Sequence, residues 1–168
     1  KLLGGPQAGI IIGSDSLLTL IRKHPLARAL RAGKLTLAGV SANLLHYLKN
    51  EAETAIPIWQ MVAKPLKAIQ ARAQHWRDYL GVGDVIPGFS TVGGGSLPTE
   101  EMPTYLLTLP VSKPDAFLSE LRNAHPPIIA RIEADQVLLD PRTVLPDQDV
   151  LLLRSLLTIL ESQNWLSE

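Results

Sequence analysis

The chain begins with residues 1–13, KLLGGPQAGIIIG, in which a lysine and two leucines precede a Gly-Gly-Pro segment and a short apolar run. The run in residues 8–13 is β-branched and bounded by glycines, which predicts a short buried strand. The Gly-Gly-Pro at 4–6 favours a tight turn over a phosphate-binding loop, because it lacks the G-x-x-x-x-G-K-[ST] pattern. Lys1 beside such a turn can form a Schiff base once its amine is desolvated, although a solvated lysine fits the same pattern.

The composition is that of one domain of ordinary size or of two small lobes, with 168 residues of which 46% are hydrophobic. The chain has no cysteine, which excludes disulfide and thiolate chemistry. Its four histidines share no ligand spacing such as H-E-x-x-H, so we predict no metal site. We expect no membrane association and a cytoplasmic location, because no apolar run approaches the roughly 20 residues of a membrane span and no secretory leader is present. The missing initiator methionine predicts either a processed chain or the downstream portion of a longer one.

Charge divides the chain into two parts. Residues 1–80 hold eleven Lys/Arg against four Asp/Glu, whereas residues 81–168 hold five against twelve. Together with a helix stop at Gly81, this predicts two domains with these boundaries. The basic part is the candidate for phosphate-bearing ligands, although two unrelated solvated faces would give the same pattern.

Proline and glycine positions divide residues 14–80 into helices. The expected helices are one through residues 17–23 that Ser14 or Asp15 can cap, one that opens at Pro25, one that follows Gly33 and ends near Lys49, and one that opens at Pro57. In the last, apolar residues recur at alternating spacings of four and three, which predicts one packing face. That face consists of Val62, Leu66, Ile69, Ala73, Trp76 and Leu80.

After residue 81 the pattern predicts a compact α/β unit in the order strand, helix, hairpin and helix. The expected elements are a strand in residues 104–109, a helix in residues 115–123, a hairpin turning at Ala134-Asp135, and a helix that opens at Pro146. Ser112 stands three residues before Asp115, as in a capping box, and is expected to cap the first of these helices. The glycine-rich residues 88–103 are expected to form a loop before the strand.

The opening K-L-L-G-G-P-Q-A-G-I is accompanied by further motifs, namely HPLARALR (24–31), KLTLA (34–38), GGGSLP (93–98), Pro126-Pro127, ARI (130–132) and, more loosely, LLDPRTV (138–144). In this order they closely resemble the bacterial selenocysteine synthases, which are L-seryl-tRNA(Sec) selenium transferases. The resemblance implies an α/β fold, fold type I of the transferases that depend on pyridoxal 5'-phosphate (PLP). Residues 1–80 would end the large PLP-binding domain and supply interdomain helices, and residues 81–168 would form the small C-terminal α/β domain.

The resemblance assigns Lys1 as the catalytic lysine that binds PLP as a Schiff base. It implies conversion of seryl-tRNA(Sec) to selenocysteinyl-tRNA(Sec) with selenophosphate, through a dehydroalanyl intermediate. The implied partners are seryl-tRNA(Sec), selenophosphate and further copies of the chain in a homo-oligomer. The tRNA-binding module would lie upstream, so the chain alone is expected to be an incomplete and inactive portion of the enzyme.

Three arginines are further candidate site residues. Arg28 and Arg31 are three apart on an expected helix and would share a face, which suits a phosphate-like dianion. The resemblance places this pair at the selenophosphate or anion site, whereas the spacing alone also fits two solvated helix arginines. For Arg131, on an expected strand, the resemblance suggests a substrate or anion contact from the small domain, and the sequence alone suggests an ion pair with Glu133.

Two other functions fit parts of the pattern. A related fold-type-I PLP lyase, acting on a small amino acid or an amino sugar phosphate, would share the lysine and the anion-binding arginines. A non-catalytic α/β interaction module would keep the fold without the chemistry. A reducible PLP adduct on Lys1 would separate both enzymes from the module, and an upstream tRNA-binding module would separate the transferase from the lyase. Asp140 and Arg142, in LLDPRTV, are expected to be structural.

Overall fold

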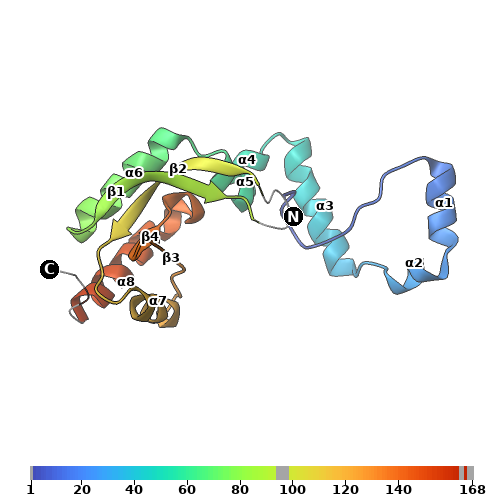
Figure 1. Cartoon of the computed structure of the whole chain (residues 1–168). Helices are drawn as coiled ribbons and strands as arrows, with labels where there is room; N and C mark the ends of the chain where they lie inside the picture. The colour runs from blue at the N-terminus through green and yellow to red at the C-terminus, as the bar shows by residue number, and fades with distance from the viewer. Residues whose placement is uncertain (1, 94–98, 163–164, 166–168) are drawn as a thin grey trace. The chain divides into compact units, whose positions relative to one another are not determined.

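The computed structural model describes residues 2–93, 99–162 and 165 of the chain. The chain forms two compact units, Lys1–Gln60 and Met61–Glu168, which we call the N-terminal unit and the C-terminal unit (Figure 1). This division falls twenty residues before the predicted boundary, because the helix that precedes Gly81 packs against the sheet of the C-terminal unit. The assignment of residues 1–80 and 81–168 to two domains of a longer enzyme stays a prediction.

The N-terminal unit is built from helices. They are α1 (Asp15–Lys23), α2 (Pro25–Ala29), α3 (Lys34–Leu48), α4 (Ala52–Ala55) and the start of α5 (Pro57–Val62). Pro25 opens α2 and Gly33 caps α3, as predicted. The helix expected to run from Pro57 is two helices, since α6 begins only after Pro65. Proline has no backbone N–H to donate and disfavours helical geometry at the residue before it, so the helix stops and restarts.

The predicted strand in residues 8–13 is wrong. These residues adopt no regular secondary structure, and the side chains of Ile11 and Ile12 are 67% and 91% exposed. A strand exists only with a neighbour that accepts and donates its backbone hydrogen bonds. The described residues of the N-terminal unit contain no strand with which residues 8–13 could pair. Apolar, β-branched sequence is therefore not sufficient to form a strand here.

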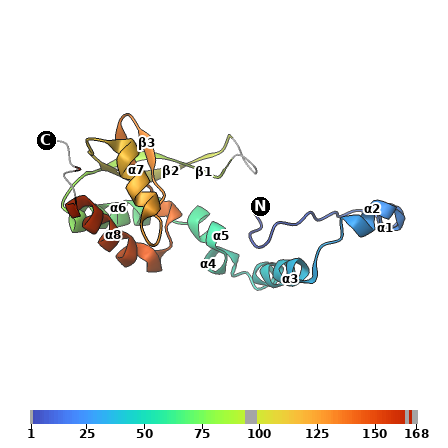
Figure 2. The same ribbon diagram turned by 90° about the horizontal axis from the view of Figure 1, so that it is seen from below.

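The C-terminal unit contains a four-stranded sheet in the order β1-β2-β4-β3, with every neighbouring pair antiparallel. The strands are β1 (Asp84–Thr91), β2 (Glu101–Leu109), β3 (Arg131–Glu133) and β4 (Gln136–Leu139). The helices are α6 (Leu66–Leu80), α7 (Pro114–Asn123) and α8 (Asp149–Ser162). Short 3-10 turns, Pro141–Thr143 and Pro146–Gln148, connect β4 to α8. Helices α6 and α8 lie side by side (Figures 1 and 2).

The long hairpin of β1 and β2 corrects the prediction that residues 88–103 form a loop. The pairing runs from Asp84 opposite Thr108 to Thr91 opposite Glu101. Two prolines obscured it, because proline removes a ladder hydrogen bond and argues against a central strand. Pro87 is accommodated because β1 is an edge strand. The middle of the predicted loop, residues 94–98, lies outside the described residues.

The apolar face predicted for α6 forms one side of the core. Ile69, Ala73, Trp76 and Leu80 are buried, and Gly81 ends the helix with a φ of 68°, as the glycine stop predicted. Val62 and Leu66 do not belong to this face, since Val62 precedes the break at Pro65 and Leu66 is 41% exposed. The rest of the core comes from β2, β4, α7 and α8.

The turn prediction for the hairpin is confirmed, and the capping prediction is wrong. Ala134 and Asp135 both have positive φ, 49° and 59°, as a two-residue turn between antiparallel strands requires. Lys113, not Ser112, is the N-cap of α7, and no side chain caps this helix. The hydroxyl of Ser112 instead donates a hydrogen bond to the carbonyl of Trp165 (3.2 Å). Tertiary contact with the C-terminal segment thus replaces the local cap.

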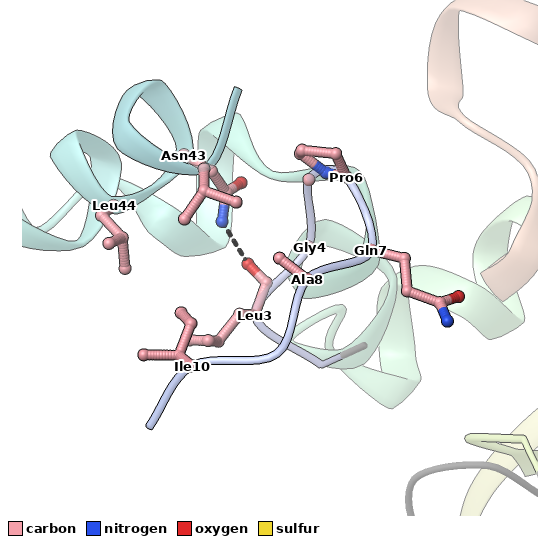
Figure 3. A pocket seen from close by; sticks show the side chains of 10 residues that line it. Leu3, Gly4, Pro6, Gln7, Ala8, Ile10, Asn43 and Leu44 are labelled. Carbon is pink, nitrogen blue, oxygen red and sulfur yellow. Dashed lines mark hydrogen bonds between the residues drawn. The ribbon is translucent and has the colours of Figure 1, made fainter. Parts of the chain in front are cut away.

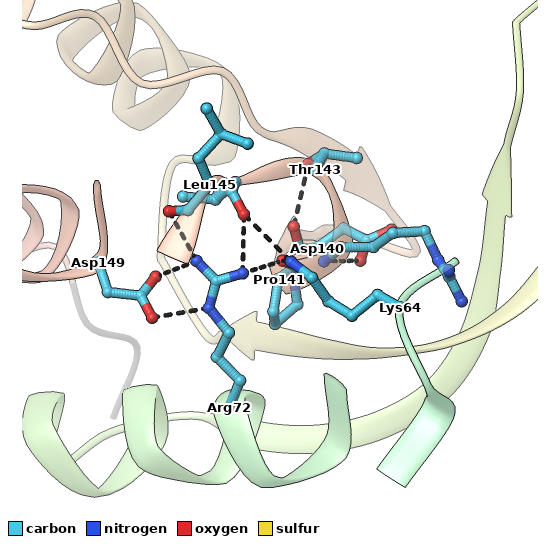
Figure 4. Close-up of polar contacts among 9 residues, drawn as sticks. Lys64, Arg72, Asp140, Pro141, Thr143, Leu145 and Asp149 are labelled. Atoms are coloured by element: carbon cyan, nitrogen blue, oxygen red, sulfur yellow. Dashed lines mark hydrogen bonds and ion pairs between the residues drawn. The ribbon is translucent and has the colours of Figure 1, made fainter. Parts of the chain in front are cut away.

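Arg72 of α6 holds the connection between β4 and α8 in place (Figure 4). Its Nε and Nη2 donate to the two carboxylate oxygens of Asp149 (2.6 and 2.5 Å). Its Nη1 donates to the carbonyls of Pro141 and Val144 (2.7 Å each), and Nη2 also donates to that of Leu145 (2.9 Å). All five N–H donors of the guanidinium are therefore used, in a side chain that is only 11% exposed.

Lys64 approaches the same turn with weaker contacts. Its Nζ donates to the carbonyls of Pro141 and Val144 at 3.4 Å each, the two oxygens that Arg72 already binds. Burial lowers the pKa of Lys64, and the positive charge of Arg72 lowers it further. The protonated amine is therefore less favourable here than in water.

Candidate functional site

The loop that follows Lys1 packs tightly against neighbouring side chains (Figure 3). Gly4 and Gly5 have φ values of +77° and +71°, which L side chains rarely adopt. A Cβ at Gly4 would lie 2.5 Å from Cγ2 of Ile56, and one at Gly5 would lie 3.2 Å from the side chain of Asn43. Both glycines are thus required by conformation and by close approach, and the predicted tight turn is confirmed.

Three residues of α3, spaced by four, contact this loop. A Cβ at Gly39 would lie 2.9 Å from the ring of Pro6, so the helix and the loop touch here. Asn43 Nδ2 donates to the carbonyl oxygen of Leu3 (2.6 Å), and Tyr47 Oη donates to the same oxygen (2.8 Å). Sequence reasoning missed these residues. The available signal was their spacing, which places positions i, i+4 and i+8 along one helix face.

Trp59 of α5 extends this contact. Its Nε1 donates to Tyr47 Oη (2.5 Å), so the hydroxyl is bonded on both sides. A cavity of about 230 Å³ lies beside the loop and is bounded by the loop itself and by α3. Its polar lining comes from Asn43, Gln7 and the backbone of the turn, and its apolar lining includes Ile10 and Leu44.

Lys1, the predicted catalytic and PLP-binding residue, lies outside the described residues. The structure shows the backbone two residues further along. There the carbonyl of Leu3 accepts two hydrogen bonds, and the crowded Gly4 and Gly5 follow it. A lysine that reacts with a bound aldehyde group needs a fixed starting position, since correct placement accounts for much of the rate of such a reaction. A fixed turn after position 1 is compatible with this need, and the assignment of Lys1 as the PLP lysine stays a prediction.

Only Arg28 of the pair Arg28 and Arg31 lies in a helix, so the predicted shared helix face is wrong. Arg28 lies in α2, which ends at Ala29, and Arg31 follows the helix. So short a helix is marginal on its own, and the chain leaves helical geometry before α3 begins. Both arginines are exposed, and no ion pair involving either is found among the described residues. Neither lines the cavity beside the glycine loop.

Arg131 is the first residue of β3, in the C-terminal unit. Its Nη2 donates to the carbonyl of Phe89 (3.2 Å) and lies 3.7 Å from the carboxylate of Glu133, the ion pair that the sequence suggested. The side chain also borders a cavity of about 200 Å³ that is lined in part by Ser90 and Thr143. A role in ligand binding stays a prediction.

Asp140 and Arg142 have the contacts of structural residues, as expected. The carboxylate of Asp140 accepts hydrogen bonds from the hydroxyls of Ser90 (2.5 Å) and Thr104 (3.0 Å) and from the backbone N–H of Arg142 (2.9 Å). Arg142 is 4% exposed, and its Nη2 donates to the carbonyl of Pro103 (2.6 Å). Burial lowers the pKa of Arg142, and the charge of Asp140 opposes this shift.

The part of the chain that the structure describes contains neither a metal-binding cluster nor a helix suited to cross a membrane. No group of three or more His, Asp or Glu side chains is arranged to hold a metal ion there. Within the same residues, no helix combines the length and hydrophobicity needed to cross a lipid bilayer.

Similar proteins identify the family. Residues 1–145 match the family model described as SelA, L-seryl-tRNA selenium transferase. Proteins named L-seryl-tRNA(Sec) selenium transferase are similar over most of the chain. The one from Solidesulfovibrio magneticus is 41% identical over 88% of this chain and 34% of its own length. The one from Aquifex aeolicus is 43% identical over 86% of this chain and 33% of its own length. The one from Moorella thermoacetica is 39% identical over 96% of this chain and 36% of its own length. The chain thus spans about a third of the length of these relatives.

A solved structure, that of D-glucosaminate-6-phosphate ammonia-lyase, resembles the fold of this chain with a TM-score of 0.51 over 82% of this chain and 34% of that chain. The sequences are 18% identical, so this likeness speaks for the fold alone. It confirms the predicted α/β fold class. The match of the family model to residues 1–145, most of the chain, shows that this chain belongs to the L-seryl-tRNA selenium transferase family.

Proposed function

We propose that this chain is the portion of a PLP-dependent L-seryl-tRNA(Sec) selenium transferase that begins at the PLP lysine. The whole enzyme would convert seryl-tRNA(Sec) to selenocysteinyl-tRNA(Sec) with selenophosphate as selenium donor. The observation that carries the proposal is the match of residues 1–145 to the family. The fixed turn that directly follows Lys1 supports it, because this turn gives the lysine a defined backbone anchor.

PLP, when bound, supplies an electron-withdrawing ring that makes the α-proton of the seryl group acidic and permits loss of its hydroxyl. The work of this chain would be to hold the lysine in place and to bind the selenium donor. The amine of Lys1, when it is not bonded to the cofactor, is also suited to move the proton at the α-carbon. A lysine on a rigid loop suits both tasks, since its long side chain moves while its backbone stays fixed.

Arg28 and Arg31 are proposed to bind selenophosphate, a phosphate-like dianion. Both guanidinium groups are exposed, and no described carboxylate neutralises them. Guanidinium groups bind such oxyanions through paired hydrogen bonds. Arg131 is proposed as a weaker candidate for substrate binding, because the 200 Å³ cavity beside it has room for a small group.

The first experiment uses the full-length protein that contains this chain, loaded with PLP and reduced with borohydride. Peptide mapping is expected to find a pyridoxyl group on Lys1, and Lys1→Ala is expected to remove it. Conversion of seryl-tRNA(Sec) with selenophosphate is expected for the wild type only. An unmodified Lys1 in a folded, PLP-treated protein would contradict the proposal and favour the non-catalytic interaction module.

The arginines are tested separately. We expect Arg28→Ala and Arg31→Ala to raise the KM for selenophosphate while loss of the serine hydroxyl continues. Arg22→Ala is the matched control, since Arg22 is an exposed cation of α1 that lies outside the predicted pair. Equal loss of both half-reactions in the Arg28 and Arg31 variants would contradict the anion-binding role.

A related lyase is the second candidate function. The fold alone leaves it open, because this chain and D-glucosaminate-6-phosphate ammonia-lyase share their architecture over most of this sequence. Incubation of the loaded protein with an amino sugar phosphate and, separately, with seryl-tRNA(Sec) distinguishes the two activities. Turnover of the sugar phosphate alone would support the lyase. For the transferase we further expect a homo-oligomer that works in the cytoplasm.

A further inference from the structure

We propose that Asn43 and Tyr47 are positioning residues that orient Lys1 by fixing the backbone carbonyl of Leu3. The inference rests on the proposed function, since it gives these α3 residues a task in holding the PLP lysine. It concerns the N-terminal unit only. Neither side chain is proposed to touch the substrate or the cofactor.

The direction of the hydrogen bonds at Tyr47 is fixed by Trp59. An indole N–H can only donate, so the Tyr47 hydroxyl must accept the hydrogen bond from Trp59 Nε1. The single hydroxyl proton of Tyr47 is then free to point at an acceptor, and the acceptor at 2.8 Å is the carbonyl of Leu3. Trp59 therefore orients Tyr47, and Tyr47 in turn holds Leu3.

Asn43 supplies the second donor to the same carbonyl. Because a carbonyl oxygen only accepts, the amide NH2 of Asn43, rather than its oxygen, faces Leu3. The side chain is also in contact with the Gly5 position, where an added Cβ would lie 3.2 Å away. Asn43 thus holds the turn both by a hydrogen bond and by packing.

These two hydrogen bonds are the main polar attachment of the loop. In the described part of the chain, no other hydrogen bond ties residues 3–13 to a helix. The bonded residues are 40 and 44 positions apart in sequence, so the attachment depends on tertiary structure. Without it, the turn would keep its packing at Gly4 and Gly39 but would lose the bonds that fix its backbone at Leu3.

Loss of either donor is expected to reduce the time that the Lys1 amine spends in a reactive position. The expected effect is roughly three- to tenfold for each bond, the range typical of one hydrogen bond. It should be seen as weaker binding of PLP and as a lower kcat. The KM for selenophosphate should stay unchanged, because the anion-binding arginines lie elsewhere in the chain.

The test uses full-length protein with Asn43→Asp and Tyr47→Phe. Asn43→Asp keeps the shape but replaces the donor by an acceptor, and Tyr47→Phe removes only the hydroxyl. Ser41→Ala is the matched control, an exposed α3 position off the contacting face. The measurements are the apparent Kd for PLP, the fraction of Lys1 recovered as the pyridoxyl form at limiting PLP, and deuterium uptake of residues 1–12 in the PLP-free protein.

We expect weaker PLP binding, less modified Lys1 and faster deuterium uptake in both variants, with no change in the control. Unchanged PLP binding and deuterium uptake in Asn43→Asp and Tyr47→Phe would overturn the inference while the proposed function stands. Absence of a pyridoxyl group on wild-type Lys1 would instead overturn the proposed function. Circular dichroism will show whether a variant unfolds. In that case the milder Trp59→Phe serves as the test, because it removes only the hydrogen bond that orients the Tyr47 hydroxyl.

Discussion

The two units of this chain contain similar apolar side chains but bury them to very different extents. In the C-terminal unit, apolar residues of α6, α7, α8, β2 and β4 form one continuous core. In the N-terminal unit, Ile56 is the only buried apolar residue among those described. Large apolar side chains there are instead exposed, among them Ile12 (91%), Leu30 (81%), Leu35 (90%) and Leu48 (79%).

The difference teaches that hydrophobicity alone does not make a core. The C-terminal unit closes on itself because a sheet with helices packed on it lets several apolar surfaces face one another. The N-terminal unit has helices but no sheet among its described residues, so its apolar faces have little to pack against. What holds its glycine loop is a small set of specific contacts rather than a core.

The largest expected effect is in the stability of the two units taken separately. We expect residues 61–168 to unfold cooperatively on heating and residues 1–60 to show no cooperative transition, because only the first has a buried core to lose. Calorimetry and circular dichroism of the two fragments measure this. A sharp melting transition of residues 1–60 alone would contradict the comparison.

A smaller effect is expected from Arg72→Met in the C-terminal unit. It leaves the Asp149 carboxylate and the carbonyl of Leu145 without this donor, and it leaves the carbonyls of Pro141 and Val144 only their long hydrogen bonds from Lys64. The loss should cost about 3 kcal/mol of unfolding free energy. Lys64→Met is the matched control, since Lys64 reaches two of the same carbonyls only at 3.4 Å. Chemical denaturation gives both values, and equal losses would mean that Arg72 isn't the main support of the turn.

The smallest expected effect is the pH dependence that Lys64 adds. Because its pKa is lowered in the folded state, the unfolded chain binds more protons between that pKa and the ordinary lysine value of 10.5. The free energy of unfolding should therefore rise with pH across this window through Lys64. Lys64→Met should remove this rise, so its stability relative to the wild type should fall as the pH increases. A difference that stays constant with pH would exclude the effect.

Elements whose signals are local could be predicted from the sequence. Pro25, Gly33 and Gly81 mark helix ends in the structure as they do in the sequence, and Ala134-Asp135 forms the expected turn. The buried face of α6 was also predicted, because helical periodicity is set by the backbone geometry itself.

Predictions that depended on a partner elsewhere in the chain were wrong. The strand expected in residues 8–13 has no neighbour, and Ser112 bonds to Trp165 instead of capping α7. The hairpin of β1 and β2 was missed because two prolines hid a pairing that the edge position of β1 permits. In each case the outcome depends on what packs nearby, which local patterns don't contain.

For the candidate site, the family and the chemistry to expect could be predicted from the residues alone, since the K-L-L-G-G-P-Q-A-G-I motif and the arginine motifs are recognisable in order. Only the tertiary structure decided how the glycine loop is held. Asn43 and Tyr47 lie 40 and 44 positions beyond Leu3 in the sequence, and they bond its carbonyl only after α3 has folded next to the loop. Trp59 of α5 then binds the hydroxyl of Tyr47. Motifs record which groups are present, whereas hydrogen bonds between distant residues exist only once folding brings donor and acceptor together.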